Sequence, residues 1–117
     1  MEKDLYDIAI VGGGPAGMTA AIYAARADKK VVLFEKNILG GQMVNSPLVE
    51  NYPGFEKISG EDLGFRMHEQ IEKLGVEIIF GEVVKIVDNS SEYIVCTEVD
   101  DEDYDYLAKT VILANGV

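Results

Sequence analysis

The sequence predicts an α/β fold built on a parallel sheet, and three observations in its first 35 residues carry the prediction. An apolar run rich in β-branched side chains occupies residues 5–11 and is typical of a buried strand. A glycine-rich turn follows and leads into a helix of small residues at 18–27. A second apolar run, residues 31–34, ends on an acid. Strand, helix and strand in this order predict a β–α–β unit with parallel strands.

The turn of this unit carries glycines with the spacing Gly-x-Gly-x-x-Gly, at Gly12, Gly14 and Gly17. Gly12 allows a sharp turn out of the strand, Gly14 brings backbone N–H groups close to a pyrophosphate, and Gly17 lets the helix pack tightly on the strand. Pro15 suits the first helical turn, where a missing N–H costs nothing. The helix start also offers unpaired N–H groups and the positive end of the helix dipole. The unit therefore predicts a Rossmann-like dinucleotide-binding site.

Glu35 stands about 20 residues beyond the glycines, where a dinucleotide-binding unit places the acid that accepts hydrogen bonds from the ribose diol. A 2′-phosphate at the same place would face a like charge, so this site is expected to take FAD or NAD and to reject NADP. Lys36 is expected to be a solvated loop charge that does not alter this preference. The spacing leaves the choice between FAD and NAD open.

The long segment from residue 36 to 59 contains several glycines and prolines and no sustained periodicity. A loop of this length inside a small domain is usually functional. Gly40 and Gly41 allow a second close approach of backbone to ligand, and the amides of Gln42 and Asn51 suit the polar edge of a flat heterocycle. The alternative is a surface loop with ordinary turn residues.

The rest of the chain predicts one more helix and the remaining strands of the sheet. Ser59 is the expected N-cap of the helix, which ends at Gly75, and His68 is expected to be a surface residue of it rather than a catalytic one. The strands are expected at residues 76–80, then 82–88, 92–99 and 104–109 as a three-stranded antiparallel meander, and 110–114 as a buried parallel strand.

Composition narrows the function further. The chain has 117 residues and a net charge of −11, which suits one small domain and argues against nucleic-acid binding. It has no apolar run of about 18 residues and no basic, apolar leader, so a cytoplasmic protein without a membrane span is expected. The acids between Glu98 and Asp105 favour a solvated hairpin tip over a cation site. Cys96, the single cysteine, is expected on a strand and cannot form an internal disulfide or a Cys-x-x-Cys pair.

Five segments in order resemble the low-molecular-weight thioredoxin reductases, and the resemblance covers the whole chain. They are the glycine motif at 12–17, Gly40-Gly41-Gln42, the Val-Glu-Asn-Tyr-Pro-Gly-Phe run at 49–55, Ile58-Ser59-Gly60, and residues 111–116. The resemblance implies that the first unit binds FAD. It also implies that residues 1–117 are the N-terminal segment of a discontinuous FAD-binding domain, an incomplete Rossmann-like fold that lacks the NAD(P)H domain and the C-terminal FAD segment.

The resemblance also implies which residues hold the cofactor. Gly12, Gly14, Pro15 and Ala16 would lie at the pyrophosphate and Glu35 at the adenosine ribose, with Gly41, Gln42 and Asn51 near the flavin and ribityl chain and the backbone of Val83 at the adenine. The full expected set is Gly12, Gly14, Pro15, Ala16, Gly17, Glu35, Lys36, Gly40, Gly41, Gln42, Asn51, Val83, Ala114 and Gly116, with no catalytic residue and no metal ligand. The family usually has Ala-Thr-Gly where this chain has Ala114-Asn115-Gly116.

The function that follows belongs to a larger parent protein. The parent is expected to be a homodimer that passes a hydride from NADPH to FAD, and then electrons to a cysteine pair outside this chain and to a thioredoxin-like partner. Relatives that would share the domain are an alkyl hydroperoxide reductase flavoprotein subunit, a ferredoxin-dependent flavin reductase and a dithiol oxidase. A non-catalytic nucleotide-binding module is the alternative of another class. Residues 1–117 alone are expected to bind FAD weakly and to lack reductase activity.

Overall fold

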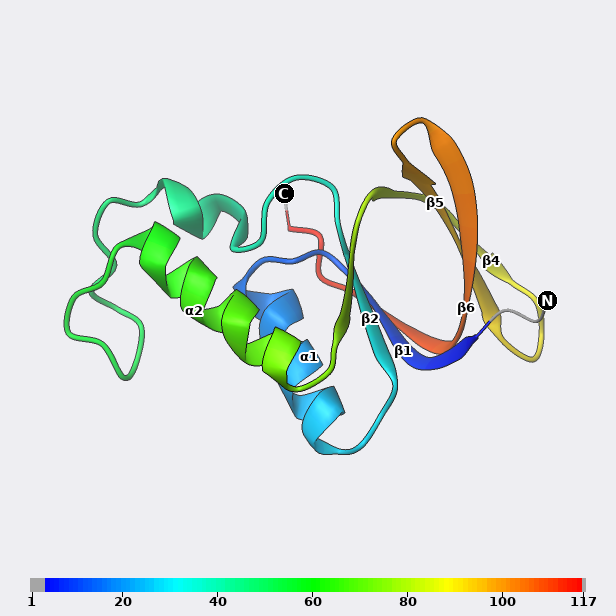
Figure 1. The fold of residues 1–117 in the computed structure, drawn as a ribbon, viewed down its shortest axis with the longest axis horizontal. Coiled ribbons are helices and arrows are strands. Elements are labelled where there is room, and N and C mark those ends of the chain that lie inside the picture. Colours follow the sequence, from blue (N-terminus) through cyan, green and yellow to red (C-terminus); the bar gives the residue numbers. More distant parts are fainter. Residues whose placement is uncertain (1–3, 117) are drawn as a thin grey trace.

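The computed structural model describes residues 4–116, which form one six-stranded sheet with two α-helices on one face (Figure 1). The strand order is β3-β2-β1-β6-β5-β4. The elements are β1 (Leu5–Val11), α1 (Pro15–Arg26), β2 (Val31–Glu35), the 3-10 helix η1 (Gly41–Asn45), α2 (Gly60–Lys73), β3 (Glu77–Phe80), β4 (Glu82–Asp88), β5 (Tyr93–Val99) and β6 (Glu102–Leu113). A mixed α/β fold with a parallel β–α–β unit and an antiparallel meander is thereby confirmed.

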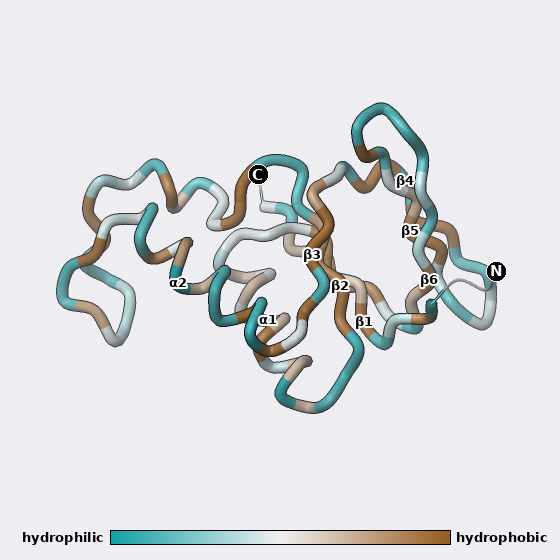
Figure 2. Tube along the Cα trace, in the orientation of Figure 1, coloured by the Kyte–Doolittle hydropathy of each residue, from teal (hydrophilic) through white to brown (hydrophobic). Residues whose placement is uncertain are grey.

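Two apolar cores lie on opposite faces of the parallel strands, because successive side chains of a strand point to opposite sides. Ile10 and Leu33 face α1 and α2, whereas Val32 and Phe34 face the meander, and all four are buried. Strand β2 is therefore apolar on both faces, as Figure 2 shows for the centre of the sheet. On the meander side the rings of Phe34 and Tyr106 meet edge to face with centroids 5.1 Å apart. This double burial places β1 and β2 inside the sheet, and the glycine turn follows directly from the end of β1.

The separation of the last two predicted strands is wrong. Residues 104–109 and 110–114 were expected as two strands, but β6 runs without a break from Glu102 to Leu113. Its first part pairs antiparallel with β5 and its second part pairs parallel with β1. No glycine or proline interrupts the run, so the strand stays extended while it changes partners. At the change of partner the Thr110 hydroxyl donates to the Asp7 carbonyl oxygen at 2.8 Å.

Helix α2 follows its predicted signals closely. The Ser59 Oγ accepts a hydrogen bond from the Asp62 N–H at 3.1 Å, and Gly75 has a left-handed φ of +85° just beyond the helix. Helix α1 begins at Pro15, three residues before the expected start, with Gly14 as its N-cap.

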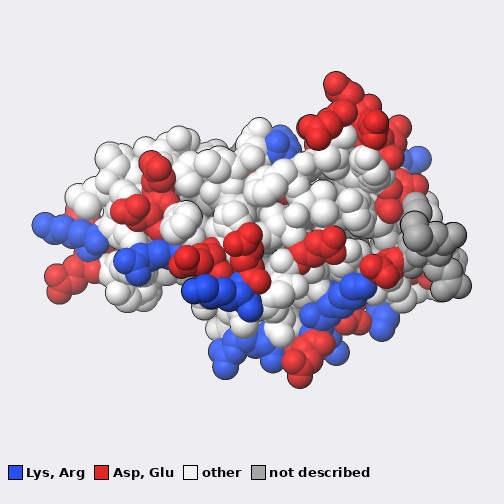
Figure 3. Space-filling model, viewed as in Figure 1, with Lys and Arg blue, Asp and Glu red and all other residues white. Residues whose placement is uncertain are grey.

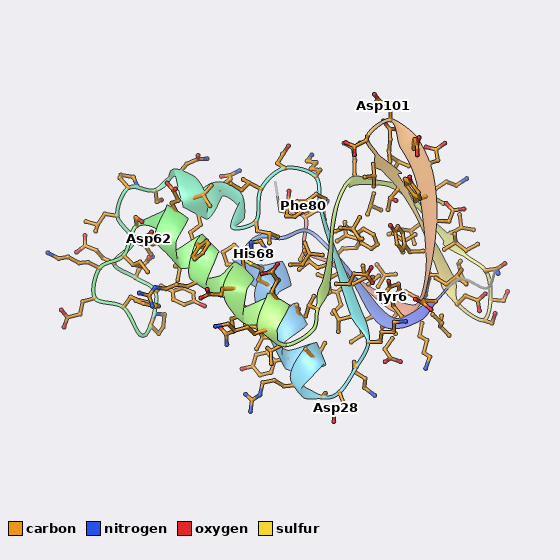
Figure 4. The ribbon with its side chains drawn as sticks, in the orientation of Figure 1. Tyr6, Asp28, Asp62, His68, Phe80 and Asp101 are labelled. Atoms are coloured by element: carbon orange, nitrogen blue, oxygen red, sulfur yellow. The ribbon has the colours of Figure 1, made fainter. Side chains whose placement is uncertain are left out.

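The acidic segment forms a hairpin tip, as expected. Asp100 and Asp101 both have positive φ, +51° and +65°, which is the backbone of a tight two-residue hairpin turn. Acidic side chains crowd this corner of the surface in Figure 3, and Asp101 projects from it in Figure 4. Within residues 4–116, no group of three or more His, Cys, Asp or Glu side chains is placed to hold a metal ion. No helix of the described part is both long and apolar enough to cross a membrane.

Asp7 ties the start of β1 to two neighbours, and its loss is expected to make stability less dependent on pH. Its carboxylate accepts a hydrogen bond from the Lys30 N–H at 2.7 Å and lies 3.1 Å from Lys109 Nζ. These contacts hold the pKa of Asp7 below its ordinary value. A lowered folded-state pKa gives stabilisation that is present above the unfolded pKa of about 3.9 and is lost as the pH falls through the folded pKa.

We therefore expect Asp7→Asn to lower the free energy of unfolding near neutral pH, and the difference from wild type to shrink below about pH 4. Urea unfolding between pH 3 and 7 measures this. Asp103→Asn, on the exposed arm of the hairpin, serves as the control. A difference that stays constant over the whole range would contradict the role given to Asp7.

Candidate functional site

A cavity of about 630 Å³ opens at the carboxyl ends of β1, β2 and β6. Open α/β sheets bind ligands at this edge, because strands run in the same direction and their following loops meet there. The residues that line the cavity come from the glycine turn, the end of β2, η1 and the end of β6. They are Gly12, Gly13, Gly14, Pro15, Ala16, Glu35, Lys36, Asn37, Ile38, Gly41, Gln42, Met43, Val44, Asn45, Ala114, Asn115 and Gly116.

Two glycines of the motif are required by the packing of the chain itself. Gly12 has φ +113°, and a Cβ there would lie 2.3 Å from the Ala114 carbonyl oxygen. A Cβ on Gly17 would lie 1.9 Å from the Gly12 carbonyl oxygen. Both neighbours are backbone atoms, which side-chain rotation cannot move away. Strand β1, helix α1 and the end of β6 therefore meet too closely for any side chain.

Gly14 differs from these two, because nothing in the protein requires a glycine there. Its φ of −77° suits any residue, and a Cβ would approach only Gly41 Cα, at 4.0 Å. Gly41 lies close beside it, since a Cβ on Gly41 would lie 3.3 Å from Gly14 Cα. The two glycines bring the glycine turn and η1 close together where both line the cavity. A ligand that approaches the backbone closely explains a glycine at position 14.

The first turn of α1 borders the cavity and favours a negative group. Within residues 4–116, no side chain caps the helix start, and its first turn contains no acid. The first N–H groups of a helix have no partner within the helix, and the dipole places partial positive charge beside them. The geometry suits a phosphate or pyrophosphate next to Gly14 and Ala16.

Glu35 is held in a fixed position at the edge of the cavity. Its Oε1 accepts a hydrogen bond from the Gly13 N–H at 2.9 Å, and its Oε2 accepts one from the Asn37 N–H at 2.8 Å. Each carboxylate oxygen has a second lone pair, so both can still accept from a ligand hydroxyl. The carboxylate is therefore held in place to accept hydrogen bonds from a diol, beside the phosphate position at Gly14 and Ala16.

A second cavity of about 320 Å³ lies on the other side of Gly12 and is lined by Val11, Gly12, Phe34, Glu35, Lys36, Gly81, Glu82, Val83, Asn115 and Gly116. Five residues line both cavities: Gly12, Glu35, Lys36, Asn115 and Gly116. The shared residues make the two cavities neighbours around the end of β1. An elongated ligand can lie across both, with Glu35 between its two parts.

The structure brings most of the expected site residues together. The first cavity is lined by Gly12, Gly14, Pro15, Ala16, Glu35, Lys36, Gly41, Gln42, Ala114 and Gly116, and the second by Val83. Gly17 and Gly40 line neither cavity and instead permit close packing. Gly40 has φ +107°, and its N–H donates to the Gly13 carbonyl oxygen at 2.7 Å, which ties the loop to the glycine turn.

Asn51 lies outside both cavities. Val49 and Ile58 pair through two backbone hydrogen bonds, of 2.7 and 3.1 Å, and this bridge closes the intervening loop on itself. Asn51 therefore lines a separate, open hollow formed by residues 50–56. His68, on α2, also lies outside both, 3.6 Å from Glu72 and in edge contact with Phe80 (Figure 4).

The sequence did not single out two polar lining residues, Asn37 and Asn45, whereas Asn115 was noted as a departure from the family pattern. Asn37 follows Lys36 directly, and Asn45 ends the 3-10 helix that begins at Gly41. These residues are near predicted site residues in the sequence, but such adjacency does not show which way a side chain points.

Comparison with known proteins agrees with this geometry. The family model for pyridine nucleotide-disulphide oxidoreductase matches residues 6–117. Thioredoxin reductase of Bacillus subtilis (strain 168) is 44% identical over 115 residues, which is 98% of this chain and 35% of that protein.

Two solved structures are similar as well. Thioredoxin reductase from Streptococcus pyogenes superposes with a TM-score of 0.86 and 46% identity, over 98% of this chain and 36% of that one. Ferredoxin-flavin thioredoxin reductase from Clostridium acetobutylicum has a TM-score of 0.84 and 33% identity, over 97% of this chain and 38% of that one. The chain spans about a third of the length of the curated relatives it matches. It therefore belongs to the pyridine nucleotide-disulphide oxidoreductase family and, as its motifs predicted, resembles the thioredoxin reductases.

Proposed function

We propose that this chain is the FAD-binding part of a thioredoxin reductase-like flavoprotein, which takes a hydride from NAD(P)H and delivers electrons to a cysteine pair and then to a thioredoxin-like partner. The observation that carries the proposal is the uncapped first turn of α1 beside Gly14, with the Glu35 carboxylate at the edge of the same cavity. The family membership and the resemblance to thioredoxin reductases support it.

Each part of FAD has residues suited to hold it. The pyrophosphate would lie against Gly14 and the first turn of α1, and Glu35 would accept hydrogen bonds from the adenosine ribose. The adenine would enter the second cavity beside Val83, and Gly41 with Gln42 would border the flavin side. FAD, when bound, would supply the hydride acceptor. The residues of this chain bind and orient it.

The dithiol chemistry of such an enzyme lies outside this chain. Cys96 is the single cysteine of the sequence and lies in β5, so the chain cannot itself contain a cysteine pair. The likeness to a ferredoxin-flavin thioredoxin reductase favours ferredoxin as a second candidate for the electron donor of the parent. Reduction of the parent flavoprotein by NADPH or by reduced ferredoxin, followed at the flavin absorbance band, separates the two donors.

Replacing Glu35 tests the ribose contact. In the parent flavoprotein, we expect Glu35→Gln to weaken FAD binding by at least roughly tenfold. A charged acceptor becomes a neutral one, and the amide can accept from only one of the Gly13 and Asn37 N–H groups. The variant is also expected to reduce the preference for ADP over 2′-phospho-ADP, because the like charge that opposes the 2′-phosphate is gone. Calorimetric titration with the three ligands measures both effects. Glu69→Gln, on the exposed side of α2, is the matched control. Unchanged FAD affinity in Glu35→Gln would show that the ribose lies elsewhere.

Gly14→Val tests the phosphate position at the start of α1. The isopropyl group would occupy the space next to the helix start, so we expect FAD binding to be lost. The fold is expected to persist, because the first added atom lies 4.0 Å from its nearest neighbour, Gly41 Cα. Flavin absorbance after gel filtration and far-UV circular dichroism of the parent flavoprotein are the two measurements.

Two further variants separate binding from folding. Gly17→Ala places a Cβ against a backbone oxygen and is expected to destabilise the protein by about 1–3 kcal/mol in urea unfolding. Ala27→Val, at the exposed far end of α1, is expected to change neither stability nor flavin binding. A Gly14→Val protein that retains flavin as well as Ala27→Val would place the cofactor away from the glycine turn.

A further inference from the structure

The second cavity contains one acidic side chain, Glu82, that the cofactor contacts considered so far do not use. The cavity pairs apolar walls, including Val11 and Val83, with four polar side chains: Glu35, Lys36, Glu82 and Asn115. Glu35 is already bound to two backbone N–H groups. Glu82 makes no side-chain hydrogen bond or ion pair within residues 4–116, and it is exposed at the start of β4.

The position of Glu82 relative to Glu35 is set by its neighbour, Gly81. The Gly81 N–H donates to the backbone carbonyl oxygen of Glu35 at 2.9 Å. A Cβ on Gly81 would lie 2.5 Å from Val99 Cγ2, so this residue is packed directly under the β5–β6 hairpin. The first residue of β4 is therefore anchored to the end of β2, next to the ribose acceptor.

Glu82 also lies where electrostatics disfavour an acid. In the register of β4 and β5 it stands opposite Glu98, and like charges on directly opposite residues of an antiparallel pair are destabilising. Only Glu82 of the two lines the cavity. The packing of the hairpin gives the Glu82 carboxylate no stabilising role. A ligand with a hydrogen-bond donor would give it one.

A carboxylate only accepts hydrogen bonds, so it suits the part of a ligand that carries a donor. The edge of adenine presents an exocyclic amine, which is such a donor. Resting on the proposed function, we infer that the Glu82 carboxylate accepts a hydrogen bond from the exocyclic amine of the adenine, so that the second cavity recognises an amino-bearing base. Glu35 then accepts hydrogen bonds from the ribose, and Glu82 accepts one from the base.

The test compares two nucleotides on the wild-type chain and its variants. ADP carries the amine, and purine riboside 5′-diphosphate is the same ligand without it. We expect wild type to bind ADP roughly tenfold more tightly, because the hydrogen bond has a charged acceptor. Glu82→Ala is expected to bring the two dissociation constants to within about twofold of each other, the outcome that identifies a direct contact in a double-mutant cycle. Glu82→Gln, which keeps a neutral acceptor, is expected to fall between them.

The ratio of the two dissociation constants is the readout, because removal of a negative charge alone changes the affinity for both nucleotides alike. Glu69→Ala is the control and is expected to keep the wild-type ratio. Urea unfolding of Glu82→Ala is expected to show unchanged or higher stability, since the repulsion from Glu98 is removed. If ADP binds and the ratio is the same in wild type and Glu82→Ala, the role of Glu82 is overturned and the proposed function stands. If wild type does not bind ADP, both the proposed nucleotide site and the role of Glu82 are contradicted.

Discussion

The whole site depends on the close approach of three backbone segments at the end of β1. The Ala114 N–H donates to the Val11 carbonyl oxygen at 2.8 Å, and the positions of Gly12 and Gly17 have no room for a Cβ. Helix α1 is thereby brought against the sheet with its N-terminus at the edge where the strands end. Both cavities share Gly12 as a wall, and a side chain at this position would push the end of β6 away from the glycine turn.

Strand β6 connects this crowded region to the antiparallel half of the sheet. One continuous strand pairs with β5 and then with β1, so β6 joins the hairpin that carries the acidic tip to the loop at residues 114–116. Gly81 and the start of β4 pack under the same hairpin. The base side of the second cavity and the phosphate side of the first are thus positioned by opposite ends of one strand.

Much of the fold and of the site was predictable from the sequence, because local signals set those parts. The periodicity of β1, α1 and β2 and the spacing from Gly14 to Glu35 specify the dinucleotide unit within one continuous segment. The continuity of β6 was not predictable, since alternating side chains look the same whichever strand is the partner. The position of Asn51 was not predictable either. It depends on the pairing of Val49 with Ile58, which no local sequence pattern indicates. Asn115 and Glu82 enter the cavities through tertiary packing.

The bridge between Val49 and Ile58 makes the intervening residues a closed side branch of the chain. The main path from η1 to α2 is completed without them, since the Gly60 N–H donates to the Ser46 carbonyl oxygen at 2.9 Å. Arg66 of α2 lies over the Phe55 ring, 5.4 Å from its centroid, and holds the branch against the helix. Tyr52 and Phe55 of the same segment pack against the apolar core that α1 and α2 cover. The run at residues 49–55, one of those by which the chain resembles the thioredoxin reductases, thus serves to attach this loop to α2.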